Sequence, residues 1–171
     1  FQLRLEDYPK SNILKISTEI QKICRDNNCL FIINDFADIA LEVSAGGVHV
    51  GSDDEKISQI RSMANKNFVI GASCYDSRHL AMQAGEAGAD YISFGAFFPT
   101  TTKIAKAKPS FEILSWASEF LNLPIVAIGG INDINAPNLV SHGADFLAVI
   151  SYVWDNPEGI ETSLNKLAKL C

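Results

Sequence analysis

Short apolar runs alternate with segments of helical periodicity along the whole chain. Apolar runs of the length of a buried strand occupy residues 30–33, 48–50, 68–72, 91–95, 124–128 and 146–150, and residues 1–5 alternate apolar and polar positions. Helical spacing of apolar residues occupies residues 11–24, 37–43, 57–65, 78–86, 111–120, 136–141 and a closing segment through residue 170, with Ser11 as the expected first N-cap. Each predicted strand is followed by a predicted helix, which is typical of a parallel sheet covered by helices.

Three stretches of the chain repeat one local pattern, in which a glycine ends a helix and a strand follows. These stretches are SAGGVHVG from Ser44, EAGADYISFG from Glu86 and SHGADFLAVIS from Ser141. A glycine can end a helix in a left-handed conformation, and the turn into a parallel strand is short. We therefore expect a helix-ending glycine in all three stretches and a fold built from repeated βα units.

The repeated units predict an α/β fold, a TIM (β/α)₈ barrel. Seven strands are predicted, whereas a closed barrel needs eight strands and typically about 250 residues. We therefore expect residues 1–171 to be a single barrel domain that is incomplete at its N-terminus, with the first strand missing from the chain. An open doubly wound sheet is the second hypothesis, but it favours a GxGxxG turn after an early strand, and the sequence has none.

Composition narrows the classes of function. The chain has 171 residues, 47% of them hydrophobic, and a formal net charge of -6 without a basic block, which argues against nucleic-acid binding. No apolar run reaches membrane length. Cys24, Cys29, Cys74 and Cys171 form no CxxC pair and no zinc-ligand spacing with histidine, so we expect reduced, mostly packing thiols in a soluble, cytoplasmic protein. The sequence does not decide between a monomer and a homo-oligomer.

The segment 91–103, YISFGAFFPTTTK, has the most specific chemistry in the chain. An apolar strand runs into a loop that contains a proline, three hydroxyl groups and an ammonium group, contributed by Thr100, Thr101, Thr102 and Lys103. Hydroxyl groups, free backbone N–H groups and one cation match phosphate oxygens, and ligands of α/β folds bind at the carboxyl ends of strands. We expect a phosphorylated substrate here, and a solvated threonine-rich surface loop is the alternative.

Polar and small residues also lie within or directly after the other predicted strands. They are Gln2, Arg4, Asn34, Asp35, His49, Asp53, Asp54, Ser73, Gly129, Gly130, Ile150 and Ser151. In a parallel barrel the carboxyl ends of the strands share one rim. We therefore expect these residues to lie near residues 99–103, called the threonine loop below.

Two chemical roles follow from this expected rim. Asp35 and Asp54 together could hold one Mg²⁺, which takes one or two carboxylates plus waters and substrate phosphates. The turn at Gly129 and Gly130 would expose backbone N–H groups to a phosphate. Purely structural roles stay open: helix caps at Asp54 and Ser151, a turn at Asn34 and Asp35, a tight glycine turn, and a satisfied core histidine at position 49.

These residues and motifs resemble the thiamine phosphate synthases, a family of (β/α)₈ barrels. The resemblance rests on QLRL from Gln2, IND from Ile33, GVHVG from Gly47, GAS from Gly71, GADYISFGAFFPTTTK from Gly88, AIGGI from Ala127 and GADFLAVIS from Gly143. It implies a Mg²⁺-dependent transferase that joins hydroxymethylpyrimidine diphosphate to hydroxyethylthiazole phosphate, or to the carboxylated thiazole. The implied products are thiamine phosphate and pyrophosphate.

The resemblance also implies a role for each residue. Gln2, Arg4 and Asn34 would contact the pyrimidine diphosphate, and Asp35 and Asp54 would bind the metal. Ser73 and Lys103, with Arg4, would act as catalytic groups at the pyrophosphate. Thr100, Thr101, Thr102, Gly130, Ile150 and Ser151 would hold the thiazole phosphate, and His49 and Gly129 complete the expected substrate-binding set. Departure of pyrophosphate from a benzylic-type carbon needs charge stabilisation and positioning more than a strong base.

Two positions depart from the family pattern. Glu6 stands where a lysine is usual, and Ser52 stands where glutamine is common. A carboxylate near a bound diphosphate weakens binding unless another cation, such as Lys10, compensates. Two alternative functions stay open: a thiazole tautomerase of the same superfamily, which would use a histidine, and a non-catalytic barrel that binds a thiamine precursor. The paired aspartates and the threonine loop favour the synthase.

Overall fold

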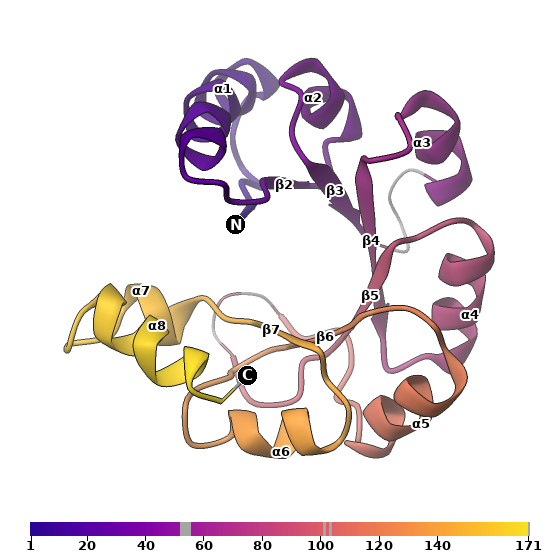
Figure 1. The fold of residues 1–171 in the computed structure, drawn as a ribbon, viewed down its shortest axis with the longest axis vertical. Coiled ribbons are helices and arrows are strands. Elements are labelled where there is room, and N and C mark those ends of the chain that lie inside the picture. The colour runs from indigo at the N-terminus through magenta and orange to yellow at the C-terminus, as the bar shows by residue number, and fades with distance from the viewer. Residues whose placement is uncertain (52–55, 101, 103, 171) are drawn as a thin grey trace. The chain divides into compact units, whose positions relative to one another are not determined.

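A computed structural model of the chain describes residues 1–51, 56–100, 102 and 104–170 (Figure 1). Its strands are β1 (Gln2–Leu3), β2 (Ile32–Asn34), β3 (Gly47–Val50), β4 (Val69–Tyr75), β5 (Tyr91–Phe94), β6 (Ile125–Ile128) and β7 (Phe146–Ala148). Its helices are α1 (Lys10–Asp26), α2 (Ala37–Glu42), α3 (Ile57–Met63), α4 (Arg78–Glu86), α5 (Glu112–Phe120), α6 (Ala136–Ser141), α7 (Ser151–Trp154) and α8 (Ile160–Ala168). The strand order in the sheet is the order of the strands in the chain, which confirms the predicted α/β fold of TIM-barrel type.

The chain divides into two compact units. Unit 1 comprises Phe1–Ser73 and Ala84–Asp90, and unit 2 comprises Cys74–Gln83 and Tyr91–Cys171. In unit 1, β1 pairs with β2, β2 with β3 and β3 with β4, and in unit 2, β5 pairs with β6 and β6 with β7. All of these pairs are parallel. The unbroken apolar runs predicted this for the strands after β1. That residues 1–171 form a single domain stays a prediction.

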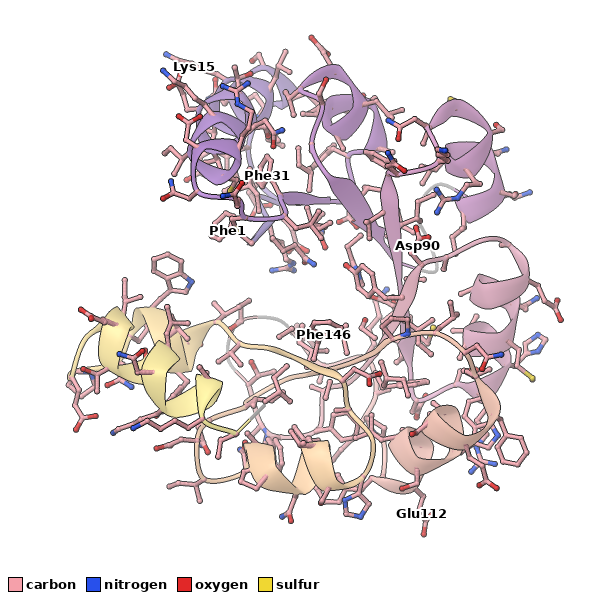
Figure 2. The ribbon with its side chains drawn as sticks, in the orientation of Figure 1. Phe1, Lys15, Phe31, Asp90, Glu112 and Phe146 are labelled. Atoms are coloured by element: carbon pink, nitrogen blue, oxygen red, sulfur yellow. The ribbon has the colours of Figure 1, made fainter. Side chains whose placement is uncertain are left out.

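The core of unit 1 lies where β2 and β3 meet α1 and α2 (Figure 1). All four residues of β3 are buried, because a parallel strand is covered on both faces. Ile13 of α1 and Ile60 of α3 are buried in the same apolar core. At the start of the chain the Phe1 ring stacks on Phe31, with ring centroids 6.3 Å apart (Figure 2).

The core of unit 2 is built from β5, β6 and the buried faces of α5 and α6. Ile92, Ile125, Leu114 and Leu139 are fully buried in it. Burial also raises the pKa of the Cys74 thiol to about 12, so this side chain stays a neutral packing group. Among the described cysteines, Cys24 and Cys74 are buried, whereas Cys29 is exposed.

The sequence repeat has a second physical cause besides the glycine turn. Asp90 and Asp145, from the two GAD motifs, each pair with a residue 20 positions earlier. The Asp90 carboxylate accepts from the Ile70 N–H at 2.7 Å, and the Asp145 carboxylate accepts from the Ile125 N–H at 2.8 Å. Each aspartate therefore fixes the start of its own strand against the neighbouring strand.

Several expected details were wrong. Gly88 and Gly143 adopt the left-handed conformation, but in the first repeat Ser44 does so, with φ 55°. Pro9 is the N-cap of α1, so Ser11 lies inside the helix. The closing helix is two helices, α7 and α8, and Gly159 before α8 has φ 89°. No helix in the described ranges combines the length and the apolar character needed to cross a membrane.

Candidate functional site

Three polar side chains in unit 1 come together where β2, β3 and β4 end. Asn34 is the last residue of β2, and its register partner is His49 in β3. The register partner of His49 is Gly71 in β4, and Ser73 follows two residues later. Register partners and residues two apart point to the same face of a sheet, so Asn34, His49 and Ser73 share one face. The predicted gathering of these three residues is confirmed.

Asp35 follows β2 in a strained backbone conformation. Its φ is 69°, and its N–H donates to the His49 carbonyl at 2.9 Å. The Asn34 amide donates to the Asp35 carboxylate at 2.6 Å. Aspartate tolerates the left-handed region better than most residues, so this turn orients a carboxylate at the strand end without requiring glycine.

The Asp35 carboxylate supplies oxygen ligands that suit a hard cation such as Mg²⁺. Asp54, its expected partner, lies outside the described residues. Within the described ranges no group of three or more histidine, cysteine, aspartate or glutamate side chains could hold a metal. Mg²⁺ binds through one or two carboxylates and takes its other ligands from water and substrate phosphates, so the residues present fit such an ion.

Residues in β1 and in the segment after it are the expected diphosphate contacts. Gln2 is exposed in β1, and the Arg4 guanidinium forms an ion pair with the Glu6 carboxylate. Lys10 donates to the Asp38 carboxylate of α2 at 2.8 Å and lowers its pKa, so this contact does not support a compensating role for Lys10 beside Glu6. Arg4 therefore already has an anionic partner within its own segment.

In unit 2 the threonine loop meets the start of α7. The Thr102 hydroxyl lies 3.2 Å from the Ser151 hydroxyl, and the Thr102 N–H donates to the Thr100 hydroxyl at 3.4 Å. The predicted approach of this loop to Ser151, the first residue of α7, is confirmed for Thr102. Thr101 and Lys103 lie outside the described residues.

The turn at Gly129 and Gly130 also belongs to this part of unit 2. Both glycines have positive φ, 104° and 62°. A Cβ at Gly130 would clash with the Pro99 carbonyl oxygen, and the Phe98 N–H donates to the Gly129 carbonyl at 3.1 Å. Glycine is therefore needed because the backbone of the threonine loop passes directly over the turn. Ile150, the N-cap of α7, is 40% exposed.

Two asparagines that were not predicted from the sequence support this turn. The Asn135 amide donates to the Gly130 carbonyl at 2.9 Å, and its side-chain oxygen accepts from the Asn132 N–H at 2.9 Å. Asparagines that bond to nearby backbone are common in turns and at helix starts. The NDIN sequence before α6 was the available signal.

A second missed pair is Tyr75 and Lys106. The Lys106 ammonium donates to the Tyr75 hydroxyl at 3.3 Å and lies 5.2 Å from the centre of its ring. Tyr75 is the last residue of β4, and Lys106 follows the threonine loop. Next to Lys106, the Ala107 carbonyl accepts a hydrogen bond from the Ala96 N–H at 3.1 Å. This pair holds the segment after the threonine loop against the end of β4. The only sequence signal for it was the lysine-rich stretch after Lys103.

The chain is similar in sequence to known proteins. A family model described as thiamine monophosphate synthase matches residues 1–153. The thiamine-phosphate synthase of Rhodospirillum centenum is 47% identical over 158 residues, covering 92% of this chain and 76% of the relative. That of Erythrobacter litoralis is 41% identical over 160 residues, covering 92% of this chain and 75% of the relative.

Solved structures agree with these relatives. Thiamine phosphate pyrophosphorylase from Pyrococcus furiosus superposes with a TM-score of 0.87 at 36% identity, covering 99% of this chain and 80% of that one. A 3-hexulose-6-phosphate synthase from Salmonella typhimurium, with a TM-score of 0.67 at 17% identity, shares the fold alone. With a family match over most of its length and relatives above 40% identity, the chain belongs to the thiamine monophosphate synthase family.

Proposed function

We propose that the chain is a thiamine phosphate synthase. It joins hydroxymethylpyrimidine diphosphate to hydroxyethylthiazole phosphate, or to the carboxylated thiazole, and releases pyrophosphate. With the carboxylated thiazole the carboxylate also leaves, as CO₂, to give the same product. The observation that carries this proposal is the pair of Thr102 and Ser151 hydroxyls beside the Gly129 and Gly130 turn, a group of uncharged donors suited to a phosphate. Membership of the family supports the reaction.

The diphosphate substrate is assigned to unit 1. The Arg4 guanidinium can donate two parallel hydrogen bonds to one phosphate group, and the Ser73 hydroxyl adds another donor. Gln2, Asn34 and His49 complete the expected contacts. Arg4 and Ser73, with Lys103 outside the described residues, are the proposed catalytic groups because the leaving pyrophosphate gains charge as it departs.

A Mg²⁺ ion is assigned to Asp35, together with Asp54. The Asn34 amide that donates to Asp35 at 2.6 Å would orient the carboxylate toward such an ion. When bound, the ion supplies positive charge that neutralises the pyrophosphate. The role of Asp35 itself is to hold the ion, and that of Asn34 is to hold Asp35.

The thiazole phosphate is assigned to unit 2. Thr100, Thr102 and Ser151 would donate hydroxyl hydrogen bonds to the phosphate oxygens, and the Gly130 turn would add backbone N–H groups. Ile150 offers an exposed apolar side chain beside Ser151 for the thiazole. The contributions of Thr101 and Lys103 stay predictions.

The chemical step transfers the pyrimidinylmethyl group from a diphosphate oxygen to the thiazole nitrogen. The bond between the pyrimidine methylene carbon and the diphosphate oxygen breaks, and its electron pair leaves with the pyrophosphate. The lone pair of the thiazole nitrogen then forms the new carbon–nitrogen bond, which makes the thiazolium ring. No proton has to move in this step, so the side chains act by positioning and by charge stabilisation.

Product analysis tests this function. The protein is incubated with both substrates and Mg²⁺, and thiamine phosphate is identified by mass spectrometry. We expect thiamine phosphate only when both substrates are present. Isomerisation of a carboxylated thiazole phosphate alone, without thiamine phosphate, would instead identify a tautomerase. A cytoplasmic location and a homo-oligomeric state stay predictions.

A further inference from the structure

We infer that His49 is a positioning residue that acts through Ser73. Its Nε2 atom fixes the direction in which the Ser73 hydroxyl donates its hydrogen, and that hydrogen binds the leaving pyrophosphate. This inference rests on the proposed function and deepens its diphosphate side.

The two side chains lie in direct contact in unit 1. His49 Nε2 is 2.9 Å from Ser73 Oγ, and the His49 side chain is buried, with the residue only 7% exposed. The strand register explains the contact: His49 stands opposite Gly71, which has no side chain, and Ser73 is the next residue of β4 on the same face. The imidazole can therefore extend over Gly71 and reach the Ser73 side chain.

The backbone holds this histidine firmly. His49 lies inside β3, which pairs with β2 on one side and with β4 on the other. Its carbonyl also accepts the Asp35 N–H at 2.9 Å, so the turn that carries the proposed metal ligand is tied to the same residue. A side chain on a central strand is held more precisely than one on a loop, which suits a positioning role.

The direction of the hydrogen bond decides what Ser73 can do. A serine hydroxyl has one hydrogen to donate and two lone pairs to accept with. If Nε2 were a bare acceptor, the hydroxyl would donate to the histidine and turn its lone pairs toward an anionic ligand. If Nε2 carries a hydrogen and donates it, the hydroxyl keeps its own hydrogen for a pyrophosphate oxygen. The productive state therefore has a hydrogen on Nε2.

This arrangement predicts an effect on turnover more than on substrate binding. Charge builds up on the pyrophosphate as the carbon–oxygen bond breaks, so a correctly aimed hydroxyl hydrogen stabilises the transition state more than the ground state. A histidine that merely filled the core would influence stability without depending on Ser73. The two roles can therefore be separated by testing whether the effect of His49 requires the serine.

A double-mutant cycle makes this test. His49→Phe keeps a flat ring but removes the donor, whereas His49→Gln keeps an N–H donor at about the same reach. We expect His49→Phe to lower kcat roughly 10- to 100-fold, as is typical for removal of a residue that orients a catalytic group. We expect His49→Gln to recover most of that loss, and His49→Phe to have no further effect on kcat in a Ser73→Ala background. Equal losses in both backgrounds would overturn the inference.

A measurement on the unmutated side chain keeps the test independent of folding and of turnover. Nitrogen NMR of ¹⁵N-histidine-labelled protein at pH 8, with Mg²⁺ and pyrophosphate added, reports which ring nitrogen carries hydrogen. His49 is assigned by comparison with His49→Gln. We expect a protonated Nε2, and a bare Nε2 in the complex would overturn the inference. Absence of turnover in the wild-type protein would count against the proposed function instead.

Discussion

Thr102 Oγ1 lies 3.2 Å from Ser151 Oγ, although 49 residues separate the two side chains. Thr102 belongs to the loop after β5, and Ser151 is the first residue of α7, which follows β7. Two hydroxyls at this distance can donate to oxygens of the same phosphate group. The pair is the firmest structural support for a thiazole phosphate site in unit 2.

Removing either hydroxyl should weaken binding of the thiazole substrate. We expect Thr102→Val and Ser151→Ala each to raise the KM for thiazole phosphate about tenfold, since a hydrogen bond to a charged group contributes about 1.5–3 kcal/mol. Steady-state kinetics with each substrate varied in turn provides the measurement, and the KM for the diphosphate should stay the same. Ser141→Ala is the matched control, because the Ser141 hydroxyl bonds to Asn138 within α6. An unchanged thiazole phosphate KM in both variants would remove this site.

Glu6 should compete with the diphosphate for Arg4. Because the two side chains form an ion pair, the substrate has to displace a carboxylate to reach the guanidinium. We expect Glu6→Gln to lower the KM for the diphosphate about two- to fivefold, the range of a partly exposed ion pair, and Glu6→Lys to lower it at least as much. Glu19→Gln, with the same charge change on α1, should leave the KM unchanged. An unchanged KM for the diphosphate in Glu6→Lys would show that position 6 does not face the substrate.

Asp35 should control the metal requirement without supporting the fold. Asparagine also tolerates the φ of 69° at this position, so Asp35→Asn should melt within a few degrees of the wild-type protein. We expect the Mg²⁺ concentration for half-maximal turnover to rise at least about tenfold, because one negatively charged ligand is lost. Asp54→Asn should behave alike. The control is Asp38→Asn, which alters a carboxylate of α2 that accepts a hydrogen bond from Lys10. An unaltered Mg²⁺ titration of Asp35→Asn would exclude Asp35 as a ligand.

Asp90 should contribute more to stability than its counterpart Asp145. Both accept a backbone N–H at a strand start, but Asp90 (labelled in Figure 2) also forms an ion pair with Arg61, whose guanidinium donates to the carbonyls of Gly88 and Phe68. We expect Asp90→Ala to lower the free energy of unfolding by about 1–3 kcal/mol, and Asp145→Ala to lower it by less. Urea unfolding of both variants provides the comparison. An equal or larger effect at Asp145 would contradict this assignment.

The strands and most helices could be predicted because their signal is local. Strand β3 is buried at every position, so its residues are small or apolar apart from His49. The helical spacing of apolar residues predicted a helix over residues 78–86, and α4 spans Arg78–Glu86 in the structure. The left-handed residue before β3 could not be predicted, because a glycine was available two positions later. Ser44 takes that conformation where its carbonyl accepts a hydrogen bond from Gln21 of α1 at 2.7 Å, a contact that sequence periodicity does not reveal.

Which side chains lie together in unit 1 was easier to predict than how they are bonded. Polar residues in and near the ends of predicted strands indicated that Asn34, His49 and Ser73 come together, since parallel strands bring their carboxyl ends together. The Arg4 and Glu6 ion pair and the support of Gly130 by Asn135 depend on side-chain conformations that no spacing rule specifies. The sequence therefore indicated which side chains lie together, and the structure shows which hydrogen bonds and ion pairs fix their positions.

Pyrophosphate release tests the central claim most directly. A coupled assay measures pyrophosphate from the wild-type protein with both substrates, with each substrate alone, and with or without Mg²⁺. The proposed synthase predicts release that requires both substrates and the metal. A folded protein that binds thiazole phosphate but releases no pyrophosphate under any of these conditions would contradict it.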